Sequence, residues 1–62
     1  MIHIMNSKDL IKQLEKAGWV VDRIRGSHHQ LVKDGRTVTV PHPKKDLPIG
    51  TVKRILKDAG IA

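Results

Sequence analysis

Two adjacent histidines near the middle of the chain are the residues best suited to acid–base chemistry. His28 and His29 directly follow the pair Gly26-Ser27. Histidine is the side-chain type whose ordinary pKa, about 6.5, lies closest to neutral pH, so it can both accept and donate a proton there. Glycine reaches backbone angles that strain other residues, so a sharp bend is possible just before the histidines. Residues 26–29 are therefore the first candidate for a catalytic site.

The strand pattern around the two histidines predicts that they point in opposite directions. Residues 28–33 favour a strand, and successive residues of a strand face opposite sides of a sheet. His29 has the parity of Leu31, which should face the core, so His28 should face solvent or a substrate. We expect His28 to be the catalytic residue, with His29 as second choice and as a partly buried structural residue. Adjacent histidines in a strand are more often structural or incidental than catalytic, and the pattern alone leaves that alternative open.

The charge of the chain points to nucleic acid. Twelve Lys and Arg against six Asp and Glu give a net charge of +6. Small basic domains commonly bind nucleic acid, because neutralising phosphates releases counterions; docking on an acidic protein is the alternative. Trp19 is the only aromatic residue, so an aromatic platform for stacking successive bases is not expected. The cations predicted to contact phosphates are Arg23, Arg25, Lys44 and Lys45.

These groups match the needs of RNA cleavage without a metal ion. A proton acceptor must activate a ribose 2′-hydroxyl, and a second group often protonates the leaving 5′-oxygen. Cations or backbone amides must also offset the charge that grows on the phosphorus centre. His28 can be the proton acceptor, and the nearby cations can offset the charge. Gly26 and Ser27 are expected to support His28 by shaping the bend before it. Ser27 has no neighbouring carboxylate for a triad, so it is expected in a turn. The second acid–base group stays unassigned.

Metal chemistry finds little support in the sequence. The chain has no cysteine, which excludes disulfides and thiolate ligands. His28, His29 and His42 lack the helical spacing of zinc enzymes, and His42, between two prolines, is expected to be a loop residue. We therefore expect neither a metal nor another cofactor.

The length of 62 residues predicts one domain spanning 1–62, with marginal stability. Residues 1–5 precede the first helix signal and are expected to be an N-terminal extension. They are too short and too weakly apolar for a signal peptide or a membrane span. A cytoplasmic location with no membrane contact is the resulting expectation.

Hydrophobic periodicity predicts the order helix, three strands, helix. The first helix should start at Asn6-Ser7, with Ser7 as its cap, and end at Gly18. Residues 19–25, 28–33 and 36–40 should form strands, with Asp34-Gly35 as a hairpin turn. The second helix should run from near Pro48 to Gly60. Two amphipathic helices on one face of a three-stranded antiparallel sheet would bury both apolar stripes, which is an α+β fold.

The apolar positions expected in the core share helical or alternating spacing. Those of the first helix are Leu10, Ile11, Leu14 and Ala17; those of the second are Ile49, Val52, Ile55, Leu56 and Ala59. Val38 and Val40 should face the core from the third strand, and Pro41 should end its pairing.

The combination of these motifs resembles the HicA toxins of bacterial HicA–HicB toxin–antitoxin systems. The likeness covers nearly the whole chain from Met5 to Ile61. Its motifs are Leu10-Ile11, Gly18-Trp19, Gly26-Ser27-His28-His29, the run 37–43, the run 44–52 and Ala59-Gly60-Ile61.

The resemblance implies a fold like the double-stranded RNA-binding domain and an activity. HicA proteins are mRNA endoribonucleases that arrest translation, need no metal, and are neutralised by a HicB antitoxin. The family's catalytic histidine corresponds to His28, and Gly26 is associated with toxicity; in some members the essential histidine falls one place later, at His29. A non-catalytic double-stranded RNA-binding module is the alternative function, and a structural or interaction domain for an acidic partner is a third.

Overall fold

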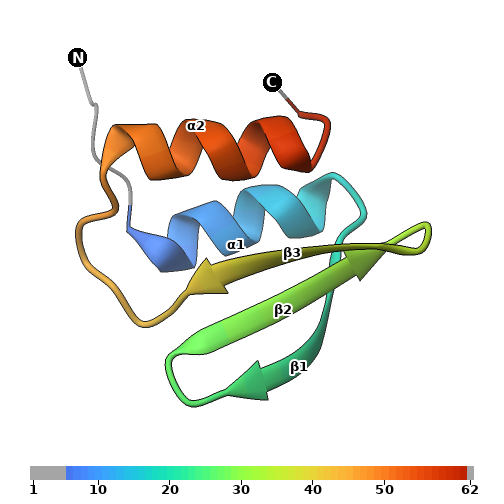
Figure 1. Cartoon of the computed structure of the whole chain (residues 1–62), viewed down its shortest axis with the longest axis horizontal. Coiled ribbons are helices and arrows are strands. Elements are labelled where there is room, and N and C mark those ends of the chain that lie inside the picture. Colours follow the sequence, from blue (N-terminus) through green and yellow to red (C-terminus); the bar gives the residue numbers. More distant parts are fainter. Residues whose placement is uncertain (1–5, 62) are drawn as a thin grey trace.

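The computed structural model describes residues 6–61 and has the predicted order of elements (Figure 1). The expected extension at residues 1–5 lies outside the described residues. The elements are α1 (Ser7–Lys16), β1 (Val20–Arg25), β2 (His28–Lys33), β3 (Arg36–Pro41) and α2 (Ile49–Asp58).

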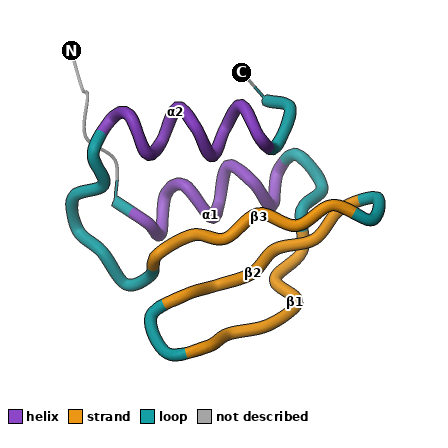
Figure 2. Tube along the Cα trace, viewed as in Figure 1, coloured by secondary structure: helices purple, strands orange, loops and turns teal. Residues whose placement is uncertain are grey.

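The three strands form one antiparallel sheet in the order β1-β2-β3. The two helices lie side by side over one face of this sheet, and no other part of residues 6–61 covers the opposite face (Figures 1 and 2). Leu31, Val38 and Val40 project from the covered face and are buried. The predicted α+β class, with two helices packed on one face of a three-stranded sheet, is therefore confirmed.

Buried apolar side chains from α1, β2, β3 and α2 make one core, in which Leu10, Leu14, Leu31 and Val40 are fully buried, and Val21 of β1 packs against it. Trp19 is 2% exposed, so the only aromatic residue belongs to this core. Ile49 is 43% exposed, and its expected place in the core was wrong. It is the first residue of α2, where the helix meets the loop and only its later turns cover the sheet.

The ends of both helices close with glycine. Gly18 has φ of +102°, and the amides of Gly18 and Trp19 donate to the carbonyls of Glu15 and Leu14. This is the hydrogen-bond pattern of a Schellman motif. Because the Trp19 amide completes the helix end, β1 begins at Val20 and not at Trp19 as expected.

The N-cap of α1 is Asn6, so the expectation that Ser7 caps the helix was wrong. The Asn6 side-chain oxygen accepts a hydrogen bond from the Asp9 amide at 2.8 Å. Ser7 is already helical and only 1% exposed, and its hydroxyl is used elsewhere.

Both hairpin turns have the backbone that their residues favour. Asp34 and Gly35 have φ of 50° and 77°, as a type I′ turn requires, so this predicted hairpin is confirmed. Gly26 has φ of 55° and is followed by Ser27, which places glycine at the first central position, as in a type II′ turn. The β1–β2 turn therefore depends on Gly26, and it leads directly into His28.

Candidate functional site

His28 lies on the open face of the sheet, opposite an arginine. Its partner in β1 is Arg25, and the next outward pair along the ladder is Arg23 with Gln30. Paired residues of antiparallel strands share a face. His28, Arg23 and Arg25 are all exposed, and this face is the one that the helices leave uncovered. The predicted catalytic residue and two of its predicted phosphate contacts therefore form one surface, which we call the basic face (His28, Arg23, Arg25).

A β-bulge decides which residues of β1 reach the basic face. Val21 pairs with Leu31, but Arg23 pairs with Gln30, so Asp22 is an extra residue between them. Simple alternation from Val21 would have placed Arg23 on the covered face. The bulge reverses the parity, so that both arginines of β1 point away from the helices.

The turn before His28 is joined to the segment after β3. Pro41 pairs with His28, so β3 extends one residue beyond the expected end. The His42 amide then donates to the Ser27 carbonyl at 2.8 Å, which continues the contact past the proline. This contact holds residues 26–29 and 41–42 together at one end of the sheet.

His42 is oriented by a buried serine of α1. The Ser7 hydroxyl lies 2.6 Å from His42 Nδ1 and accepts a hydrogen bond from the Lys44 amide at 2.9 Å. The Ser7 amide in turn donates to the Lys44 carbonyl at 2.9 Å. His42 is thus a loop residue, as expected, but three hydrogen bonds at Ser7 fix the loop that carries it.

The second predicted pair of cations borders this loop. Lys44 and Lys45 are exposed and, with Lys8, border a shallow hollow of about 340 Å³ beside the start of α1. They lie at the same end of the sheet as the Gly26-Ser27 turn, as the contact between His42 and Ser27 requires.

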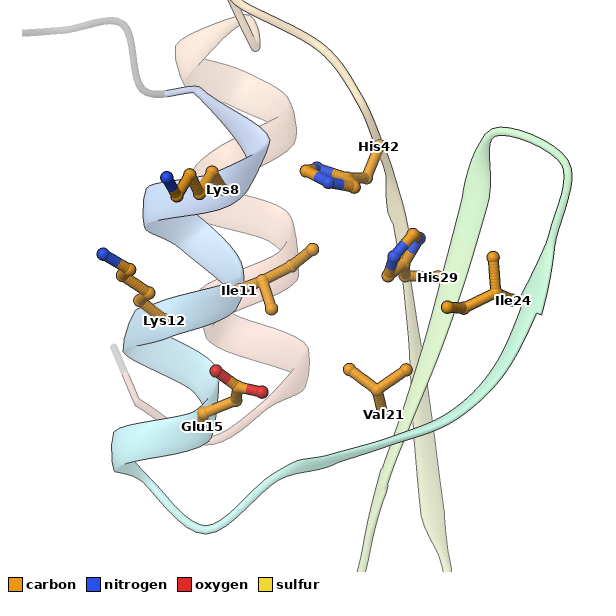
Figure 3. Close-up of a pocket in the computed structure, with 8 residues that line it drawn as sticks. All are labelled: Lys8, Ile11, Lys12, Glu15, Val21, Ile24, His29 and His42. Atoms are coloured by element: carbon orange, nitrogen blue, oxygen red, sulfur yellow. The ribbon is translucent and has the colours of Figure 1, made fainter.

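His29 and His42 meet on the covered side of the sheet. Their ring centres are 4.6 Å apart, and the rings are nearly perpendicular, at 77°. His29 is half-buried, as expected from its parity with Leu31, and its buried Nδ1 has no hydrogen-bond partner among the described residues. The two rings form one end of a cleft between α1 and β1 with a volume of about 380 Å³ (Figure 3).

No group of three or more His, Cys, Asp or Glu that could hold a metal ion occurs in residues 6–61. Within the same range, no helix is long and apolar enough to cross a membrane.

A family model described as the HicA toxin of bacterial toxin–antitoxin systems matches residues 7–61. The chain belongs to the HicA toxin family. It is therefore the toxin component of a toxin–antitoxin system, and membership in the family implies an antitoxin as its partner. No curated protein gives a significant match to the sequence.

In this HicA toxin, the sequence interpretation missed two residues at the end of the sheet. Ser7 had been expected to cap α1, and His42 had been given no role. The sequence could have predicted that His42 lies on the covered side of the sheet. His42 is two residues after Val40 and therefore faces the same side if the strand direction continues past Pro41. Nothing in the sequence pairs Ser7 with His42, because they are 35 residues apart.

Proposed function

We propose that this HicA toxin is a metal-independent endoribonuclease that cleaves mRNA and thereby arrests translation. The observation that carries the proposal is the position of His28, exposed and directly opposite Arg25 on the basic face. An accessible imidazole beside an arginine provides a proton acceptor and a cation at one place, which is what cleavage at a ribose phosphate requires.

The proposed reaction starts at the ribose 2′-hydroxyl. His28 accepts its proton, and the 2′-oxygen attacks the adjacent phosphorus. The bond from phosphorus to the 5′-oxygen breaks, and that oxygen takes a proton from water or from a second acid that we leave unassigned. The products are a 2′,3′-cyclic phosphate and a free 5′-hydroxyl. Arg25 and Arg23 offset the charge on the phosphate as it reacts.

The supporting roles follow from the turn. Gly26 and Ser27 set the bend that leads into His28, and the Ser27 carbonyl accepts the His42 amide. Lys44 and Lys45 extend the positive surface beyond the end of the sheet, where the RNA backbone can continue. Neither a metal nor a cofactor takes part in the proposed reaction.

The proposed partners are mRNA and a HicB-type antitoxin, and the proposed place of action is the cytoplasm, where mRNA is translated. An antitoxin that covers the basic face would remove access to His28 and to both arginines at once. This is how we propose that the toxin is neutralised.

Expression of the wild type, His28→Ala and His29→Ala in a bacterium tests the proposal, with growth and the integrity of a reporter mRNA as readouts. We expect arrest and mRNA cleavage with the wild type, neither with His28→Ala, and cleavage at a reduced level with His29→Ala, because His29 is half-buried and lines the cleft between α1 and β1. Because His28 is exposed, its replacement should leave the fold intact, which circular dichroism can check. Toxicity that survives in His28→Ala but is lost in His29→Ala would move the chemistry to His29.

A non-catalytic double-stranded RNA-binding module is the second candidate, favoured by the order of elements and by the exposed arginines. It predicts salt-sensitive binding to duplex RNA without cleavage. In that case substitutions at Lys44 and Lys45 should matter more than His28→Ala.

A further inference from the structure

The cleft between α1 and β1 lies just behind the basic face, on the other side of the same strands. Ile24 lines the cleft and is followed by Arg25, while His29 lines it and is preceded by His28. Neighbouring strand residues are only about 3.3 Å apart and point to opposite faces. β1 is an edge strand of the sheet, and no other strand of residues 6–61 pairs with its outer edge, so a chain bound at Arg25 can pass around this edge into the cleft.

The walls of the cleft are apolar, and one of them is unusually exposed. Ile11 of α1 and Val21 and Ile24 of β1 face one another across it (Figure 3). Ile24 is 60% exposed although it pairs with His29 and so points to the covered side of the sheet. A flat apolar ligand would bury this surface.

The polar end of the cleft offers a hydrogen-bond donor. The Ser7 hydroxyl can donate to Nδ1 of neutral His42 while its oxygen accepts the Lys44 amide, and in that tautomer the His42 proton is on Nε2. In this tautomer Nε2 can donate a hydrogen bond to an acceptor atom of a ligand.

The charged residues at the rim complete the pattern. Lys8, Lys12 and Glu15 of α1 line the cleft, and in Figure 3 the two lysine side chains extend away from Ile24. Ammonium groups suit a phosphate, whereas a carboxylate accepts from an exocyclic amino group. With apolar walls and imidazole rings, this set matches a nucleotide, whose base is flat and carries both donors and acceptors.

We propose that the cleft binds one unpaired nucleotide of the RNA substrate, with its base between Ile11 and Ile24 and its edge at His42. The volume of about 380 Å³ falls within the range of small-molecule sites. This inference rests on the proposed RNA substrate. It adds a subsite, separate from His28, that favours single-stranded over duplex RNA, because a paired base cannot leave its stack without cost.

Binding of nucleoside 5′-monophosphates, followed by chemical shifts of the isoleucine and valine methyl groups, tests the subsite without any cleavage step. Inorganic phosphate is the control probe. The variants are Ile24→Ala and the matched Val20→Ala, whose side chain is equally exposed, at 62%, but projects from the other face of β1. We expect nucleotide-dependent shifts at Ile11, Val21 and Ile24 that phosphate alone does not cause.

Ile24→Ala should weaken nucleotide and single-stranded RNA binding about tenfold, from the loss of apolar contact, while Val20→Ala changes it less than about twofold. Equal effects of the two variants, or shifts caused equally by phosphate, would overturn the subsite. So would an unchanged nucleotide affinity in Ile24→Ala together with weaker antitoxin binding, which would assign the cleft to the protein partner.

The outcome for the subsite is distinguishable from that for the ribonuclease. Nucleotide binding that depends on Ile24 in a protein that never cleaves RNA would support the subsite and contradict the catalytic proposal. RNA cleavage that depends on His28, with KM and kcat both unchanged in Ile24→Ala, would support the catalytic proposal and contradict the subsite.

Discussion

Arg25 lies directly opposite His28 in the β1–β2 ladder, and both side chains are exposed on the face of the sheet that the helices leave open. Arg25 shares the face of His28 because the bulge at Asp22 reverses the side of the sheet to which the later side chains of β1 point. Arg25 is thus the cation best placed to act on a phosphate at His28.

Arg25→Ala should weaken RNA binding and flatten its dependence on salt. Loss of one phosphate contact should lower the slope of log K against log[salt] by about 0.7 to 1. Arg54→Ala removes the same charge from an exposed site on α2, which lies on the other side of the sheet, and is the matched control. Filter binding at several salt concentrations gives both slopes, and equal effects of the two variants would contradict a specific role of Arg25.

Ser7→Ala should destabilise the fold. Ser7 is 1% exposed, and its hydroxyl is bonded both to His42 and to the Lys44 amide, which would lose their partner. Leaving such groups unpaired costs about 1–3 kcal/mol, and each kcal/mol lowers the melting temperature of a domain this small by about 4–8 °C. Ser27→Ala, at an exposed serine, should change it by less than about 2 °C. Similar melting temperatures for the two variants would argue against the Ser7 network.

Gly26→Ala should impair toxicity more than stability. No atom lies within 4 Å of the added Cβ, so the cost of about 1–2 kcal/mol arises from the positive φ of 55° alone. Relief of that strain would shift the turn and the His28 that follows it. Gly50→Ala is the control, since Gly50 is helical with equal open space and should gain about 0.4–1 kcal/mol. Denaturant unfolding and growth assays on both variants check this, and full toxicity in Gly26→Ala would show that the bend is dispensable.

Leu31→Ala should unfold much of the population. Leu31 is fully buried at the centre of the sheet, and such a truncation costs about 2–5 kcal/mol, close to the whole stability of a small domain. Val20→Ala, on the open face of β1 and 62% exposed, should cost less than about 1 kcal/mol. Urea unfolding of the two variants measures the difference, and a small loss in Leu31→Ala would mean that the core lies elsewhere.

Local patterns in the sequence were enough to predict the elements of the fold. The apolar stripes of α1 and α2, the turn at Asp34-Gly35 and the glycines that end the helices act through neighbouring residues, so they can be read along the chain. The same holds for the opposite facing of His28 and His29, which follows from the pleat of a strand.

The sequence by itself thus determined the α+β architecture, the family and the identity of the candidate histidine, because these depend on local periodicity and on motif residues. Only the tertiary structure decided which residues meet. The bulge at Asp22 moved Arg23 and Arg25 to the face of His28, and the packing of α1 against the loop after β3 brought Ser7 to His42. The physical reason is that one extra residue in a ladder reverses the facing of all those after it, and contacts between distant residues depend on how whole elements pack.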